Sequence, residues 1–237
     1  MKNTILIVED DPAVQEVVCF VLREANFLVS TAQNAHDAWA SIRKAPPALI
    51  LLDWMLPGLS GLELARQLKR TSDTRKIPVV ILTAKGEEED KLLGFESGVD
   101  DYVTKPFSSR ELVARIKAVL RRAMIHDGED EEAVATYGEI RLDPATWRVT
   151  ARGDPVTLGP TEFRLIHFLM QNPERIHSRA GLLDRVWGTH VAIEERTVDV
   201  YMRRLRRALA NGHCDRYLQT VRSVGYRLSL EVYDELA

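Results

Sequence analysis

Short apolar runs alternate with amphipathic stretches over residues 1–122. The apolar runs are ILIV at 5–8, FLVST at 27–31, ALILL at 48–52, PVVIL at 78–82 and DYVT at 101–104. Stretches with helical spacing follow them at 12–25, 35–44, 60–70, 87–96 and 108–122. This alternation predicts an α/β unit with a parallel sheet and helices on both faces. Its size and right-handed crossovers favour a flavodoxin-like fold with strand order 2-1-3-4-5 and any ligand at the carboxyl ends of the strands.

The pattern changes after an acidic stretch, HDGEDEEAVAT at 126–136. Strand-like pieces (YGEIRLD, WRVTARGDPVTL) come first, and helices are predicted over GPTEFRLIHFLMQNP, over SRAGLLDRVWG and from about Glu195–Thr197 to Ala210. YLQTVR and YRLSL then predict a hairpin around SVG. We therefore expect a first domain over 1–122, an acidic linker over 123–136 and a small α+β domain over 137–232.

Charge separates the two halves of the chain. The formal net charge is −3, but residues 137–237 carry 15 arginines and no lysine against 13 acidic residues. Arginine suits the gripping of phosphates and base edges because its guanidinium is a planar fork. The apolar runs are far shorter than the roughly 20 residues that a membrane-spanning helix needs. Cys19 and Cys214 lack partner spacing, so we expect reduced thiols in a cytoplasmic protein.

Polar side chains gather where the predicted parallel strands end. Glu9-Asp10-Asp11 follow the first strand, Asp53 the third, Thr83 the fourth and Lys105 the fifth. Clustered carboxylates need a cation to neutralise them, and hard oxygens with access to water suit Mg²⁺. A carboxylate beside Mg²⁺, a lysine and a threonine is suited to attack phosphorus. The simpler interpretation of a strand-end aspartate is a helix N-cap, and Asp11 before Pro12 fits that pattern well.

Four motifs resemble the receiver domain of bacterial response regulators: VEDD at 8–11, LLDWMLPGLSG at 51–61, LTAK at 82–85 and TKPF at 104–107. The resemblance implies that a sensor histidine kinase phosphorylates Asp53. Thr83 and Lys105 would then contact the phosphoryl oxygens, next to a cis Lys105-Pro106 bond. The implied Mg²⁺ ligands are Asp10, Asp53 and the backbone carbonyl of Met55, with Asp11 assisting. The implied conformational switch is the pair Thr83 and Tyr102, whereas Trp54 could be a core residue or could screen the site.

Residues 137–230 resemble the winged-helix output domain of the OmpR/PhoB subfamily, through GPTEFRLIHFLM, SRAGLLDRVWG, RTVDVYMRRLRRAL and TVRSVGYR. In this subfamily the face formed by residues 87–122 pairs charges across a symmetric dimer. We expect Lys91 to pair with Glu111 and Asp101 with Arg115. Isolated exposed pairs contribute little, but an isologous interface repeats each one.

The segment TVDVYMRRLRRAL predicts a helix that reads DNA. Val198, Met202, Leu205 and Leu209 form its apolar stripe, and the opposite face carries Arg203, Arg204 and Arg207 with Val200. An ordinary solvated helix face is the alternative, but four arginines with one acid favour the DNA major groove. By the subfamily resemblance, Arg204 reads bases and Arg222 enters the minor groove. The same resemblance assigns phosphates or flanking edges to Thr197, Tyr201, Arg203, Arg206 and Thr220.

The loop after the second output helix, WGTHVAIEE at 187–195, is expected to contact the sigma subunit of RNA polymerase. The residues that the resemblance assigns to this contact are Trp187, Gly188, Ile193 and Glu195.

These expectations together describe a transcriptional activator, in which phosphorylation promotes dimerisation and binding to tandem DNA half-sites, within the branch that controls phosphate-starvation genes. A phosphatase is disfavoured because Met55 stands where such enzymes carry a second acid, and a nucleotide-binding loop is absent. A constitutive DNA-binding protein with a silent receiver is the other alternative, and the complete set of strand-end residues argues against it.

Overall fold

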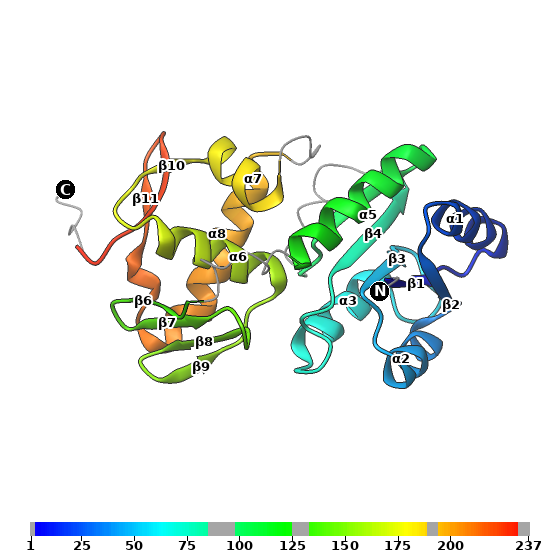
Figure 1. Ribbon diagram of the computed structural model, residues 1–237, viewed down its shortest axis with the longest axis horizontal. Helices are drawn as coiled ribbons and strands as arrows, with labels where there is room; N and C mark the ends of the chain where they lie inside the picture. The colour runs from blue at the N-terminus through cyan, green and yellow to red at the C-terminus, as the bar shows by residue number, and fades with distance from the viewer. Residues whose placement is uncertain (1–2, 85–97, 125–132, 189–193, 232–237) are drawn as a thin grey trace. The chain divides into compact units, whose positions relative to one another are not determined.

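The first unit of the chain, Met1–Ala123, is built on a five-stranded parallel sheet. Its strands are β1 (Thr4–Val8), β2 (Leu28–Ala32), β3 (Leu49–Asp53), β4 (Val79–Ala84) and β5 (Asp101–Lys105). They lie in the order β2-β1-β3-β4-β5, which confirms the predicted topology (Figure 1). β3 is buried at every position because neighbouring strands and both helical layers cover it, so the apolar run before Asp53 is explained.

Helices cover both faces of this sheet. They are α1 (Pro12–Glu24), α2 (Ala35–Lys44), α3 (Gly61–Arg70) and α5 (Ser109–Met124). α1 and α5 share one core with alternate residues of the strands, and α2 and α3 lie on the opposite face (Figure 1). The computed structural model describes residues 3–84, 98–124, 133–188 and 194–231, so the helix expected over 87–96 lies outside the described residues.

The segment after β3 turns sharply back toward the strand. Gly58 adopts a positive φ of 80°, and the Gly61 N–H donates to the Trp54 carbonyl at 2.9 Å. A Cβ on Gly61 would lie 1.9 Å from the Asp53 carbonyl oxygen, so only glycine permits this approach. Ser60 and Glu63 form a capping box that starts α3 immediately afterwards. The LLDWMLPGLSG motif thereby fixes the backbone on which the Asp53 side chain stands.

A buried ion pair closes the opposite end of the sheet. Lys69 Nζ of α3 lies 2.7 Å from Asp100 Oδ2 and donates to the Ile77 carbonyl at 2.8 Å. The same Asp100 oxygen accepts the Val79 N–H at 2.9 Å. The two charged side chains are only 6% and 2% exposed, so water cannot solvate them and each must neutralise the charge of the other. The pair joins α3 to the starts of β4 and β5.

The second unit, Met124–Ala237, has the α+β architecture that the sequence predicts. A four-stranded antiparallel sheet comes first: β6 (Ala135–Tyr137), β7 (Ile140–Asp143), β8 (Arg148–Ala151) and β9 (Asp154–Val156). Three helices follow, α6 (Pro160–Gln171), α7 (Arg179–Trp187) and α8 (Arg196–Leu209), and each contacts the other two. The closing sheet has the order β10-β12-β11, formed by β10 (His177–Ser178), β11 (Leu218–Val221) and β12 (Gly225–Leu228).

The acidic linker differs from its expected bounds of 123–136. α5 continues to Met124, and Ala135 and Thr136 belong to β6, where they pair with Leu142 and Arg141. The first residues of the expected linker therefore belong to α5 and the last ones to β6. The backbone hydrogen bonds of these elements continue into the region that the charge pattern assigned to the linker. Residues 125–132 lie outside the described residues. In the described part of the chain, no helix is long and apolar enough to cross a membrane.

Lys69→Met should lower the free energy of unfolding of the first unit by about 3–5 kcal/mol, because Asp100 would remain buried without its cation. Urea denaturation followed by circular dichroism measures the change. The control is Lys44→Met at an exposed position of α2, which should change stability by less than ~0.5 kcal/mol. Equal effects of the two substitutions would contradict a structural role for the buried pair.

Candidate functional site

Three carboxylates meet at the carboxyl edge of the parallel sheet. Glu9 and Asp10 follow β1, and Asp53 is the last residue of β3, its neighbour in the sheet. One oxygen of each lies within 4.8 Å of the others. Glu9 and Asp53 are 2% and 5% exposed, whereas Asp10 is exposed to solvent. The cluster is therefore a buried pair of acids with one acid at its mouth.

Lys105, the last residue of β5, supplies the balancing charge. Its Nζ lies 2.7 Å from Asp53 Oδ1 and 2.8 Å from Glu9 Oε2. Burial opposes the charge on Lys105, but its hydrogen bonds to Asp53 and Glu9 outweigh burial and raise the pKa of the ammonium. Burial is the main reason that the pKa of Glu9 is raised, and the nearby Asp53 charge adds to it against the opposing effect of Lys105. One lysine thus neutralises part of a cluster that remains acidic.

The second oxygen of Asp53 accepts the Met55 N–H at 3.1 Å. Met55 itself is 73% exposed, so the chain beside the carboxylate is open to solvent. Thr83 is buried at the end of β4, and its hydroxyl donates to the Ala84 carbonyl at 3.0 Å. Trp54 is half-buried. The peptide bond between Lys105 and Pro106 is cis, which confirms that prediction.

The structure separates Asp11 from the cluster. Its carboxylate caps α1 by accepting the Ala13 N–H at 2.8 Å and the Val14 N–H at 3.4 Å. The simpler interpretation therefore describes Asp11 better than an assisting role at a metal. Glu9, a strand-end acid that was not among the expected Mg²⁺ ligands, contacts Lys105 instead. The run of three acids at the end of β1 was the available signal, but the sequence could not say which of them points inward.

Glu9, Asp10 and Asp53 are compatible with a divalent cation at this edge of the sheet. Their oxygens are hard ligands, and the exposed Asp10 gives water access to the cluster. Asp53 has a fixed backbone and an adjacent ammonium, and its neighbours Asp10 and Met55 are exposed to solvent, which are favourable conditions for a carboxylate nucleophile.

The charged residues expected at a dimer interface meet within one chain. Arg115 of α5 pairs with Asp101 at 3.4 Å and with Glu111 at 3.0 Å. Tyr102 is buried on β5 beside this group. Lys91 lies outside the described residues. The intramolecular pairs hold the Arg115 side chain against its own chain, with only 13% of it exposed.

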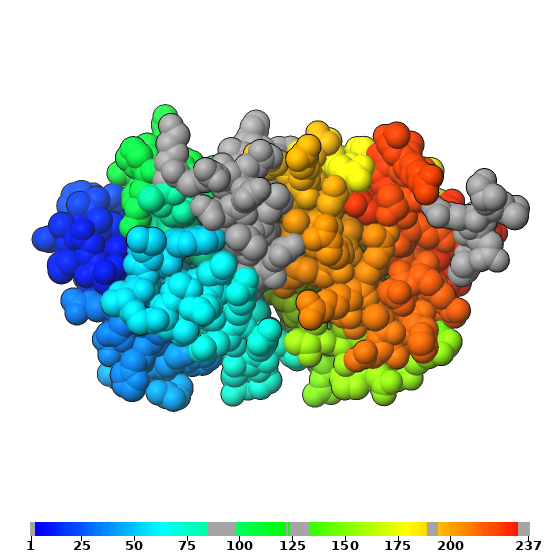
Figure 2. All heavy atoms as spheres, turned by 180° about the vertical axis from the view of Figure 1, so that it is seen from behind, coloured from blue at the N-terminus to red at the C-terminus, as the bar shows by residue number. Residues whose placement is uncertain are grey.

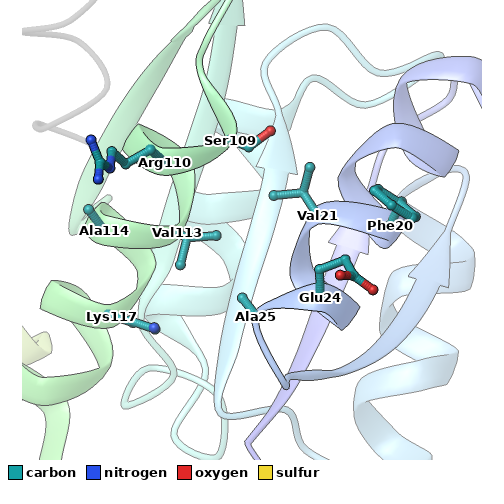
Figure 3. A pocket seen from close by; sticks show the side chains of 9 residues that line it. All are labelled: Phe20, Val21, Glu24, Ala25, Ser109, Arg110, Val113, Ala114 and Lys117. Carbon is teal, nitrogen blue, oxygen red and sulfur yellow. The ribbon is translucent and has the colours of Figure 1, made fainter.

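A groove of about 510 Å³ lies between α1 and α5 (Figure 3). Phe20 and Val21 line it from α1 and Val113 from α5, while Arg110 and Lys117 border it. None of the three clustered carboxylates belongs to its lining, so it is separate from the acidic cluster.

The buried face of α8 is wider than the four-residue stripe that the sequence predicts. Val200 is 5% exposed rather than solvent-facing, and Thr197 and Tyr201 are 2% and 0% exposed. The Tyr201 ring packs edge-on against Trp187 of α7, with ring centroids 5.0 Å apart, and Trp187 is fully buried too. Tyr201 is therefore not placed to contact DNA, nor Trp187 to contact a polymerase, because α6 and α7 cover this side of the helix. Thr197 likewise has almost no exposed surface.

The arginines of α8 divide into exposed and braced residues. Arg203 and Arg207 are exposed, as are Thr220 and Arg222 of the hairpin region, and Figure 2 shows α8 (orange) at the surface of its unit. Arg206 is braced: it donates to the Leu218 carbonyl at 2.8 Å and to Thr220 Oγ1 at 2.7 Å.

Arg204 is braced differently, by an ion pair with Glu162 of α6. At the other expected contact region, Gly188 is half-buried and Glu195 is exposed, whereas Ile193 lies outside the described residues.

Two family models match the chain. The response regulator receiver domain matches residues 5–117, and the C-terminal domain of transcriptional regulatory proteins matches residues 153–228. The receiver fold, its acidic edge and the DNA-binding domain define a two-component response regulator with a histidine kinase and DNA as partners. The chain belongs to the OmpR/PhoB subfamily of response regulators, a family of transcriptional regulators rather than of enzymes.

Within this subfamily the chain is similar to the phosphate regulon transcriptional regulatory protein PhoB. It is 54% identical to PhoB of Escherichia coli strain K12 over 97% of this chain and 99% of the relative. It is 53% identical to PhoB of Pseudomonas aeruginosa over 96% of this chain and 97% of the relative. Among solved structures, a RitR mutant matches with a TM-score of 0.79 and 27% identity over 95% of this chain and 98% of that chain.

Asp10→Asn should weaken binding of Mg²⁺ by roughly tenfold or more, because it removes one of the few charged oxygens that this cation prefers. Isothermal titration calorimetry measures the affinity. Asp11→Asn is the matched control: its amide oxygen can still cap α1, and the affinity should change by less than about twofold. A larger loss for Asp11→Asn than for Asp10→Asn would reverse the assignment of the two residues.

Proposed function

We propose that a sensor histidine kinase phosphorylates Asp53, and that the phosphorylated protein dimerises and binds DNA to regulate phosphate-starvation genes. The observation that carries this proposal is the contact of Lys105 with both Asp53 and Glu9 beside the exposed Asp10. The part concerning phosphate starvation rests on the names of relatives that are 53–54% identical over nearly the whole chain.

The chemical step is a phosphoryl transfer between two side chains. A carboxylate oxygen of Asp53 attacks the phosphorus of the kinase phosphohistidine, the O–P bond forms, and the N–P bond to the imidazole breaks. Asp10, Asp53 and the Met55 backbone carbonyl would hold Mg²⁺, which supplies positive charge to the phosphoryl oxygens when bound. Lys105 needs only a small movement to contact those oxygens, because its ammonium already lies 2.7 Å from Asp53.

Thr83 and Tyr102 would transmit the change. The Thr83 hydroxyl would exchange its hydrogen bond to the Ala84 carbonyl for one to a phosphoryl oxygen. Tyr102 lies on β5, next to the strand that carries Thr83, and would shift with it. Such a change needs to alter a pre-existing equilibrium by only a few kcal/mol.

The dimer would use the face that the subfamily resemblance assigns to residues 87–122, a range that includes β5 and α5. The pairs across its twofold axis would be Lys91 with Glu111 and Asp101 with Arg115. Because Arg115 already contacts Asp101 and Glu111 of its own chain, dimerisation would exchange or share these contacts rather than create new charge. Because contacts are exchanged, each ion pair would add little net free energy to dimerisation, as expected for an interface that forms only after phosphorylation.

In the DNA complex, α8 would enter the major groove and the hairpin would reach the neighbouring minor groove. Arg204 would contact base edges, Arg203 and Arg206 phosphates, Thr220 the adjacent backbone and Arg222 the minor groove. A dimer would place two such helices on tandem half-sites. Gly188, Ile193 and Glu195 would contact the sigma subunit of RNA polymerase, whereas Trp187 is buried inside the unit.

Beryllofluoride with Mg²⁺ should make the wild-type protein dimeric and raise its affinity for DNA selected from a random library by roughly tenfold or more. Asp53→Ala should show neither effect. Analytical ultracentrifugation measures dimerisation, and fluorescence anisotropy measures DNA affinity.

Three other results would each contradict the proposal. A wild-type protein that neither dimerises nor binds more tightly has no such switch. Tight binding by wild type and Asp53→Ala without beryllofluoride indicates a constitutive DNA-binding protein. Steady release of phosphate from acetyl phosphate at many turnovers per second indicates an enzyme.

A further inference from the structure

Arg204 is held on two sides by its own unit. Its guanidinium forms an ion pair with Glu162 of α6, and it lies over the Tyr201 ring at 5.4 Å from the centroid. Tyr201 is held in turn by its T-shaped contact with the Trp187 ring. Only 22% of the Arg204 side chain is exposed, in contrast to its exposed neighbours Arg203 and Arg207.

Glu162 has no part in the proposed chemistry or in the proposed contacts to DNA, yet it is a buried charge. Its side chain is 5% exposed, and a carboxylate at that depth needs a paired cation. The backbone makes room for it: a Cβ on Gly159 would lie 2.6 Å from Glu162 Oε2. Gly159 has a φ of −79°, so its small size rather than its backbone freedom is what this position uses. The GPTEF segment thus leaves space for the Glu162 carboxylate, which points toward Arg204.

We propose that Glu162 is a positioning residue that makes Arg204 selective for a base rather than for phosphates. The inference rests on the proposed function, in which Arg204 contacts base edges. A guanidinium has five N–H donors, so one that Glu162 engages keeps others for a base. Fixing the side chain before binding reduces the conformational entropy that binding would otherwise cost.

The carboxylate also acts through its charge. An unpaired arginine at the DNA surface binds any phosphate within reach, and that affinity is independent of sequence. Glu162 offsets the charge of Arg204 and so lowers this non-specific affinity. Both effects raise the ratio of specific to non-specific binding, which is the quantity that matters for a regulator.

Glu162→Gln should therefore lose selectivity without losing affinity for DNA in general. We expect discrimination at the base pair that Arg204 reads to fall by about tenfold. Binding to unrelated DNA should become tighter, and the plot of log affinity against log salt should steepen by up to ~0.9. Fluorescence anisotropy measures the discrimination, the affinity for unrelated DNA and the salt slope, on the full chain activated with beryllofluoride. The duplexes are the selected DNA, its single base-pair variants and an unrelated sequence, each at several salt concentrations.

Two matched variants separate position from charge. Gly159→Ala keeps every charge but displaces the Glu162 carboxylate, so it should lower discrimination and leave binding to unrelated DNA less changed than Glu162→Gln. Glu139→Gln removes an exposed carboxylate whose partners are Arg152, Arg216 and the Tyr217 hydroxyl, outside the proposed DNA contacts, and should change neither quantity. If Glu162→Gln does not fold, as judged by its circular dichroism melting curve, Gly159→Ala decides the outcome.

Arg204→Ala completes the cycle. It should lose discrimination at the same base pair, and Glu162→Gln/Arg204→Ala should be no worse than Arg204→Ala alone. A Glu162→Gln protein that binds all DNA equally more weakly, or keeps full discrimination, overturns the inference. If Arg204→Ala loses the same affinity on every sequence, the base-reading role itself fails, and the proposal for Glu162 fails with it.

Discussion

The ion pairs of Lys105 with Asp53 and Glu9 are the interaction on which the acidic edge of the first unit depends. Like charges held this close in a buried place oppose one another unless a cation neutralises them. Glu9 directly follows β1, and Asp53 and Lys105 are the last residues of β3 and β5; the order β2-β1-β3-β4-β5 brings these carboxyl ends together. One lysine does not neutralise all three carboxylates, so the cluster keeps a negative charge. A divalent cation can bind there and neutralise it before a phosphoryl group arrives.

The second unit uses paired charges in a different way. Asp199 of α8 accepts from Arg179 at 2.7 Å and from the Tyr226 hydroxyl at 2.6 Å, which joins the starts of α7 and α8 to the hairpin. Arg206 ties α8 to β11, and Glu162 ties it to α6. The exposed arginines therefore belong to a helix that hydrogen bonds and ion pairs connect to α6, α7 and the hairpin. A rigid support of this kind is what selective contacts to DNA require.

The sequence predicted the sheet order and most element bounds because unbroken apolar runs and helical spacing are strong local signals. It also located Asp53, Thr83 and Lys105, since strand ends in a parallel sheet are adjacent by geometry. It did not separate Glu9 from Asp11, because inward and capping orientations depend on local turns. It misplaced Val200, Tyr201 and Trp187 because the width of a buried helix face depends on which helices pack beside it. The partner of Arg204 lies 42 positions away in the chain, beyond any local pattern.

The central claim is that Asp53, among the clustered acids, is the nucleophile. Treatment with acetyl phosphate and Mg²⁺, reduction of the acyl phosphate with borohydride, and peptide mass spectrometry identify the modified residue directly. We expect modification at position 53, since that carboxylate has an adjacent ammonium and lies beside the exposed Asp10 and Met55. Modification at Glu9 or Asp10 instead, or none at all in folded protein, would contradict this account.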